Sequence, residues 1–122
     1  MKFIEAFAIA AALVFLSTPA DAEGFGTKGP AQLYDTYCAQ CHGLDRNGKG
    51  INTVGLSVQP RDHTDAKAMG DVPDDQMFLA IQKGGLAVNK SILMPAWDSV
   101  LTTEEIASLV TYLREVCNCG KK

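Results

Sequence analysis

The sequence Cys38-Ala39-Gln40-Cys41-His42 carries the strongest signal in this chain of 122 residues. Two cysteines separated by two residues, with a histidine directly after the second, form the spacing of covalent haem attachment. The thiols can form thioethers with the vinyl groups on one edge of a porphyrin, and the next side chain is then tethered under the iron, where an imidazole can bind. We therefore predict one covalently bound haem, attached through Cys38 and Cys41, with His42 as an axial ligand of the iron.

Three other interpretations of these cysteines explain less. A redox-active dithiol of the thioredoxin type requires a βαβ context, which is not visible in the sequence. A zinc site requires four ligands, for which Cys117 and Cys119 are available, but a Cys-x-Cys pair at the end of a helix is an unusual half-site. The zinc site and a simple disulfide between Cys38 and Cys41 both leave His42 unexplained.

The first 22 residues have the features of a secretory signal peptide. Lys2 precedes an unbroken apolar run at residues 6–16, and Ala20-Asp21-Ala22 forms an Ala-x-Ala cleavage site. The apolar run is shorter than the roughly 20 residues that span a bilayer. We expect cleavage after Ala22, one domain at residues 23–122, a periplasmic location and no stable membrane insertion after cleavage. An uncleaved N-terminal anchor is the alternative.

The overall charge and the chain length limit the possible partners. The formal net charge is −3 at pH 7, which argues against nucleic acid or anionic lipid as a partner, because both attract basic proteins. A domain of this size can bury only a small core of its own. A bound porphyrin would supply much of the missing apolar contact.

The spacing of apolar residues predicts two helices in the first two thirds of the domain. The first begins at Pro30, which suits the first turn of a helix, and contains the cysteine motif before Gly43 ends it. The second begins near Pro73 and ends at Gly84-Gly85. Residues 44–70 and 86–100 show no sustained period, so we expect irregular loops, the first of which can wrap the porphyrin edge.

A third predicted helix, near the C-terminus, has the clearest boundaries. Thr102-x-x-Glu105 is a capping box, in which each side chain bonds to the backbone amide of the other residue. The apolar residues that follow share one helical face, namely Ile106, Leu109, Val110, Leu113 and Val116. No segment has the pattern of a well-defined strand, and the predicted fold class is therefore all-α.

The sixth position on the iron is filled in an electron carrier and open in a ligand-binding or catalytic haem protein. A thioether sulfur favours ferrous iron and raises the reduction potential. Met94 lies in a loop before Pro95, which can hold the backbone rigidly, whereas Met77 lies on the apolar face of a helix and Met69 in a polar loop. We favour Met94 as the ligand. The main alternative is His63, which would lower the potential.

Four short motifs are spread along residues 38–114: Cys38-x-x-Cys41-His42-Gly43, Pro60-Arg61-Asp62, Met94-Pro95-x-Trp97 and Leu109-Val110-x-Tyr112-Leu113-Arg114. With them, the domain resembles class I c-type cytochromes along nearly its whole length. The resemblance implies that the N- and C-terminal helices cross and that loops wrap one haem with one edge exposed. It also implies that His42 and Met94 are the axial ligands and that Arg61 and Trp97 lie near the haem propionates.

Two features depart from that family. His63 follows Pro-Arg-Asp where such proteins often carry an apolar residue, and the tail Cys117-Asn118-Cys119 is not part of the family pattern. If two thiols are bound to haem, Cys117 and Cys119 can bridge each other, link two molecules or stay free.

The predicted function is that of a monomeric periplasmic electron carrier, not an enzyme, which binds redox partner proteins transiently over small patches. The first alternative is a haem-based gas sensor or a peroxidase-like protein with an open or exchangeable sixth ligand. The second alternative is a cysteine-rich zinc module without haem.

Overall fold

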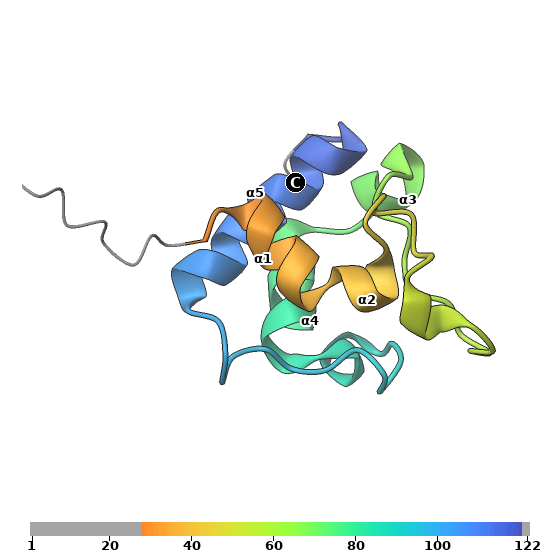
Figure 1. The fold of residues 1–122 in the computed structure, drawn as a ribbon. Coiled ribbons are helices and arrows are strands. Elements are labelled where there is room, and N and C mark those ends of the chain that lie inside the picture. The colour runs from red at the N-terminus through yellow and green to blue at the C-terminus, as the bar shows by residue number, and fades with distance from the viewer. Residues whose placement is uncertain (1–27, 121–122) are drawn as a thin grey trace, which may run out of the picture.

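The computed structural model describes residues 28–120, and within this range the chain forms helices and turns but no strand (Figure 1). The predicted signal peptide at residues 1–22 and the start of the domain lie outside the described residues. The elements, in chain order, are α1 (Pro30–Tyr37), α2 (Ala39–His42), η1 (Ile51–Thr53), α3 (Ala66–Gly70), α4 (Asp74–Lys83), η2 (Gly85–Val88) and α5 (Thr103–Cys117), where η marks a 3-10 turn.

The first predicted helix is present but has a break at the first cysteine of the motif. Pro30 begins α1, and Cys38, with φ −109° and ψ −32°, separates α1 from the short α2. The amides of Cys41 and His42 both donate to the carbonyl of Cys38, so the chain turns again at once. Gly43 ends α2 with a φ of 82°, which favours glycine. The break places the whole motif on one compact turn.

The predicted loops contain short helical elements that the sequence pattern did not indicate. Helix α3 lies in the segment 44–70, and Asp65 caps it, because its side chain accepts a hydrogen bond of 3.0 Å from the amide of Ala68. The turn η1 also lies within the segment 44–70, and η2 begins one residue before the segment 86–100. The expectation of purely irregular loops was wrong here, because elements of three to five residues are too short to produce a period in the sequence.

The other two predicted helices are confirmed. Helix α4 follows Pro73 and ends at Gly84. Helix α5 begins with the predicted capping box: the Glu105 amide lies 3.2 Å from Thr102 Oγ1, and the Thr102 amide lies 2.8 Å from Glu105 Oε2. Four residues of the predicted face are buried and Val116 is half-buried, while the buried side of α5 also includes Arg114 and Cys117.

The core forms where α1 and α4 both pack against α5, and α1 lies across α5 in Figure 1. Tyr34 of α1 and Tyr112 of α5 meet edge to face, with ring centroids 5.8 Å apart. This arrangement confirms the predicted all-α fold with contact between its first and last helices. The fully buried large side chains are Leu33, Tyr34, Met69, Ile106 and Leu109. Within residues 28–120, no helix has the length and apolar character needed to span a bilayer.

Candidate haem-binding site

The two cysteines of the motif lie together at the junction of α1 and α2. Both have free thiols and both are half-buried. Burial, and then the neighbouring Cys41, raise the pKa of Cys38 to about 12. A thiol of this kind stays protonated at neutral pH, unlike the activated thiolates of redox-active dithiols.

His42 is held in the protonation state that a metal ligand needs. Its Nδ1 lies 3.1 Å from the backbone carbonyl oxygen of Arg61, and because a carbonyl can only accept, Nδ1 must carry the proton and donate it. The lone pair is therefore on Nε2. Burial lowers the pKa of His42 further below its usual value, so the ring stays neutral. A neutral imidazole fixed through its second nitrogen is the usual form of a protein metal ligand.

His63 supports His42 from one side. The two imidazole rings are stacked, with centroids 4.3 Å apart and planes 17° apart. His63 is 8% exposed; its Nδ1 lies 3.0 Å from the Tyr34 hydroxyl, and its amide donates to the Arg46 carbonyl at 2.7 Å. Burial, and then the neighbouring His42, lower the pKa of His63 to about 3. His63 is therefore a neutral, buried ring that lies between His42 and Tyr34 of helix α1.

One aromatic contact joins the segment from Met94 to Trp97 to the residue just before the cysteine motif. The Trp97 ring lies 5.4 Å from the ring of Tyr37, the residue before Cys38. Met94 is half-buried against the core, and its carbonyl accepts a hydrogen bond of 2.9 Å from the Gly85 amide. This loop and the motif thus converge on one part of the domain, although they are about 55 residues apart in sequence.

The predicted site residue Arg61 is also beside the motif, but its backbone makes the contact. The Arg61 carbonyl binds His42, whereas its exposed guanidinium lies 3.4 Å from the Ala68 carbonyl through Nη1. The backbone oxygen of Arg61 was not part of the sequence prediction, since nothing in a side-chain motif indicates it.

The burial of the other methionines and the pairing of the last two cysteines bear on the alternatives for the site. Met69 and Met77 are both buried in the hydrophobic core. Cys117 and Cys119 are joined by a disulfide, the first of the three predicted possibilities. Among residues 28–120, no three His, Cys, Asp or Glu side chains lie together as a metal site would require. A zinc module built on four cysteines is therefore inconsistent with this structure.

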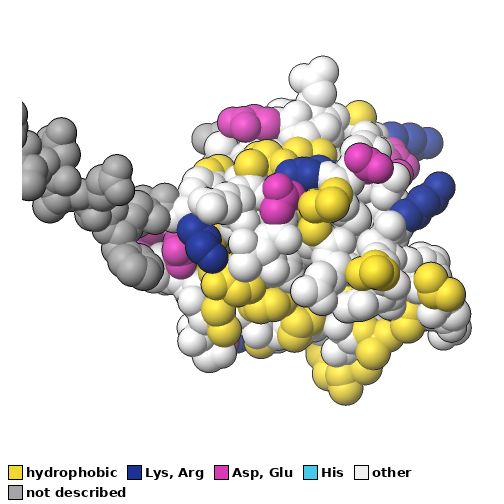
Figure 2. All heavy atoms as spheres, viewed as in Figure 1, with side chains coloured by type: hydrophobic (Ala, Val, Ile, Leu, Met, Phe, Trp, Pro, Cys, Tyr) yellow, Lys and Arg dark blue, Asp and Glu magenta, His cyan; other side chains and the backbone are white. Residues whose placement is uncertain are grey.

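Exposed apolar side chains flank the motif on two segments. Ile51 and Val54, close after the motif, are 82% and 91% exposed, and Ile92 and Leu93, just before Met94, are also exposed. Figure 2 shows hydrophobic side chains gathered along the lower part of the domain, where the loops after α2 and α4 lie in Figure 1. A small protein rarely exposes so many large apolar groups without a partner for them. The site therefore offers what a covalently bound haem needs, namely two thiols, a neutral imidazole and an apolar surface.

Arg46 has a structural role that the sequence analysis missed. It adopts a φ of 61° and donates through Nε to the Tyr112 hydroxyl at 2.7 Å, while its Nη2 lies 2.8 Å from Asp35. Its guanidinium also lies over the Tyr34 ring, 4.9 Å from the centroid. Arg46 therefore links the loop after the motif to both α1 and α5. Only long-range contacts reveal this role, since no local pattern surrounds the residue.

An all-helical domain in which a Cys-x-x-Cys-His turn presents a neutral imidazole beside an apolar surface is a c-type cytochrome domain. This chain belongs to the family described as cytochrome c oxidase, cbb3-type, subunit III, whose family model matches residues 26–113. The resemblance to class I c-type cytochromes is thus confirmed, and haem c is the cofactor that this family implies.

Relatives with known structures or functions are similar to this chain at moderate identity. It is 31% identical over 83 residues to the quinohemoprotein alcohol dehydrogenase ADH-IIG of Pseudomonas putida, a match that covers 68% of this chain and 10% of that protein. Its fold is similar to that of the KustC0563 c-type cytochrome, with a TM-score of 0.57 and 26% identity over 78% of this chain and the whole of the other.

A second similar structure belongs to a larger assembly. The reducing HAO-like protein complex Kustc0457/Kustc0458 of Kuenenia stuttgartiensis matches with a TM-score of 0.56 and 27% identity, over 74% of this chain and 42% of the other. The domain therefore has relatives both as a separate cytochrome and as part of larger redox proteins.

Proposed function

We propose that this protein is an exported, monomeric electron carrier with one haem c, attached through Cys38 and Cys41 and bound axially by His42 and Met94. The observation that carries the proposal is the geometry of His42, whose Nδ1 proton is bound by the Arg61 carbonyl so that Nε2 is free to bind iron. The resemblance of the chain to electron-transfer cytochromes supports the same role.

The contacts of the competing side chains favour Met94 as the second axial ligand. His63 stacks directly on His42 at 4.3 Å, whereas two ligands on opposite faces of one iron must have the metal between them. Met69 is 1% exposed and packed within the core. Met94 is half-buried on a loop whose Trp97 contacts the residue before the motif, and this supports Met94 over His63 and Met69 as the ligand.

When bound, the haem supplies a one-electron ferric–ferrous couple. The residues of this chain would fix its ligands, exclude water and provide propionate contacts. Arg61 and Trp97 are the proposed propionate neighbours, since a guanidinium and an indole N–H can both donate to a carboxylate. A rigid ligand set of this kind limits reorganisation on electron exchange, and one accessible porphyrin edge suffices for it.

The partners would be redox proteins that bind transiently over small patches. Two of the similar proteins are a quinohemoprotein alcohol dehydrogenase and a reducing HAO-like protein complex. We infer that this carrier exchanges electrons with an exported oxidoreductase. Mass spectrometry of the purified protein should show a chain that begins at Glu23 and carries the added mass of one haem.

Absorption spectroscopy of the ferric protein and of single variants tests the ligand set. A weak far-red sulfur-to-iron band should be present, and Met94→Ala should abolish it and lower the reduction potential. Met69→Leu, Met77→Leu and His63→Leu are the matched controls and should retain the band. A band that survives in Met94→Ala would contradict the assignment of Met94.

The binding of carbon monoxide distinguishes an electron carrier from a haem sensor or a peroxidase-like protein. Six-coordinate ferrous haem should not bind carbon monoxide at neutral pH in the parent protein but should bind it in Met94→Ala. Rapid, tight binding by the parent would indicate an open sixth position and would favour the alternative. A haem stain on a denaturing gel, which detects only covalent haem, tests the attachment through Cys38 and Cys41.

A further inference from the structure

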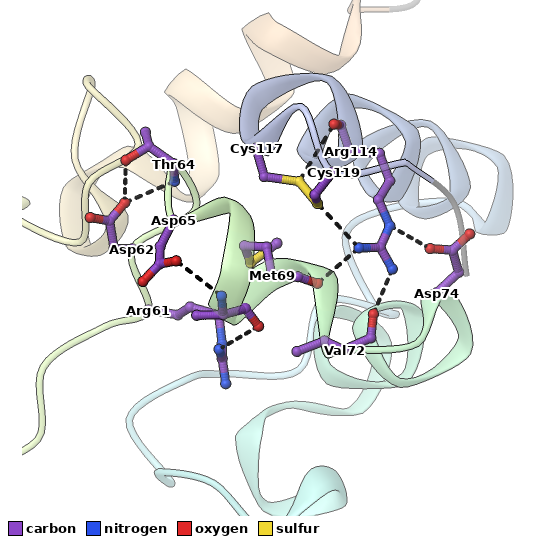
Figure 3. The surroundings of a disulfide bond; sticks show 11 residues. Arg61, Asp62, Thr64, Asp65, Met69, Val72, Asp74, Arg114, Cys117 and Cys119 are labelled. Atoms are coloured by element: carbon purple, nitrogen blue, oxygen red, sulfur yellow. Dashed lines mark hydrogen bonds and ion pairs between the residues drawn. A yellow bond between two sulfur atoms is a disulfide. The ribbon is translucent and has the colours of Figure 1, made fainter.

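We propose that the Cys117–Cys119 disulfide is a thiol–disulfide exchange site that accepts two electrons from a dithiol, with Cys119 as the sulfur that is attacked. Neither cysteine belongs to the proposed haem site, so this activity is separate from the one-electron chemistry proposed above. Figure 3 shows the disulfide beside the Arg114 guanidinium, close to Met69 and Val72.

The position of this disulfide suits exchange better than a structural role. It joins the last residue of α5 to the second residue beyond it, with a sequence separation of 2. A cross-link that closes so short a loop removes little freedom from the unfolded chain. Helix α5 is already held by its capping box and by its buried face. The fold therefore does not depend on this bond, and the bond can open without loss of the core.

The two sulfur atoms differ in accessibility. Cys117 is 2% exposed and belongs to the hydrophobic core, whereas Cys119 is half-buried at the edge of it. An external thiolate can reach a disulfide sulfur only along an open approach. Attack on Cys119 is therefore favoured, and Cys117 is the sulfur that leaves.

In the disulfide form, both sulfur atoms already lie within 3.4 Å of polar atoms of Arg114. Cys117 Sγ lies 3.4 Å from the Arg114 carbonyl oxygen, to which a thiol can donate but a disulfide sulfur cannot. Cys119 Sγ lies 3.4 Å from Arg114 Nη1, and a guanidinium beside a sulfur favours its thiolate. Groups that stabilise the reduced form make a disulfide easier to reduce.

The guanidinium of Arg114 is fixed independently of the disulfide. Its Nε donates to Asp74 Oδ1 at 2.7 Å, and its Nη1 and Nη2 donate to the carbonyls of Met69 at 2.8 Å and Val72 at 2.5 Å. Arg114 is buried, and these partners come from α3, α4 and the turn between them. The cation therefore stays in place whether the two sulfurs are bonded or not.

The exchange balances as a two-electron reduction by a dithiol. A thiolate of the dithiol attacks Cys119 Sγ, the Cys117–Cys119 bond breaks, and its electron pair goes to Cys117 Sγ, which takes a proton. The second sulfur of the dithiol, as a thiolate, then attacks the dithiol sulfur that is bonded to Cys119. This attack expels Cys119 as a thiolate beside Arg114. The dithiol becomes a disulfide, its one remaining thiol proton ends on Cys117, and the products in this chain are the Cys117 thiol and the Cys119 thiolate.

A redox titration of the holoprotein against reduced and oxidised dithiothreitol tests the proposal. Thiols are trapped with a maleimide, and peptide mapping assigns each label. The reduction should be reversible, and the Cys119 thiol should be labelled at dithiothreitol ratios that leave the disulfides of a reference secreted protein intact. A pair that stays unlabelled until the protein is denatured would overturn the proposal. Labels on Cys38 or Cys41 would contradict the proposed haem attachment instead, so the two failures are distinguishable.

Two single variants test the predicted difference between the sulfurs. In Cys117→Ser the remaining thiol is Cys119, and in Cys119→Ser it is Cys117. Alkylation by iodoacetamide at pH 7 should be at least about tenfold faster in Cys117→Ser, because Cys119 is accessible and lies beside a cation. Equal rates, or a faster reaction of Cys117, would overturn the assignment of Cys119. Unchanged haem absorption in both variants shows that the fold is intact.

Discussion

At the scale of single residues, the contact between Tyr34 and His63 is the least expected feature of the site. The sequence identified His63 only as a departure from the family and as a possible sixth ligand. In the structure it is a buried ring between Tyr34 and His42. Its position could not be predicted, because it depends on contacts between residues 29 positions apart.

A double-mutant cycle tests the Tyr34–His63 pair. Tyr34→Phe should lower the free energy of unfolding by about 1–3 kcal/mol, because it leaves a buried ring nitrogen without a partner. Adding His63→Leu should restore part of this loss, since both polar groups are then absent. Denaturant unfolding of the four proteins measures the coupling. Tyr37→Phe, on the same helix, is the control; strictly additive effects would contradict the pairing.

The ionisation of Tyr34 adds a pH dependence with a definite sign. Burial raises the pKa of Tyr34 above its usual value of 10.0. The folded state therefore holds the phenol proton more tightly than the unfolded state, so this contribution to stability is complete below pH 10 and is lost as the pH rises further. We expect the stability difference between the parent and Tyr34→Phe to shrink from about pH 9 to 11. Urea unfolding at several pH values checks this; a constant difference would contradict it.

At the scale of helices, the ends with clear chemical signals were predictable. The capping box of α5, Pro30 in α1 and the glycines that end α2 and α4 all have local causes. Helix α3 and the turns η1 and η2 were missed because they are too short for a periodic pattern. The haem motif itself is local, so Cys38, Cys41 and His42 could be predicted from the sequence as haem-binding residues, whereas the Arg61 carbonyl that contacts His42 could be found only from the fold.

The cap of α5 allows a quantitative test at this scale. Thr102→Ala should lower the free energy of unfolding by about 1 kcal/mol, because the Glu105 amide loses its acceptor. Thr102→Ser keeps the hydroxyl and should cost much less. Thermal unfolding of both variants measures the difference. An unchanged melting temperature for Thr102→Ala would show that this cap does not stabilise the helix.

At the scale of the whole molecule, the exposed apolar side chains around the motif lead us to expect a fold that depends on haem. The variant Cys38→Ala/Cys41→Ala should lose the covalent cofactor and unfold without a cooperative transition, because the apolar side chains exposed around the motif would then have no partner. Circular dichroism during heating measures this. The matched control, Cys117→Ala/Cys119→Ala, should keep both the haem and a cooperative transition. Cooperative unfolding of the first variant at the parent's temperature would contradict the dependence.

The contact between Trp97 and Tyr37 provides an optical reporter. The chain has one tryptophan, and its ring lies 5.4 Å from that of Tyr37, directly before the first cysteine of the motif. A porphyrin joined to that cysteine would quench the indole emission by energy transfer. Fluorescence should therefore be nearly dark in the native protein and brighten when the chain unfolds and carries Trp97 far from the porphyrin, which makes the loss of this packing visible without any added label.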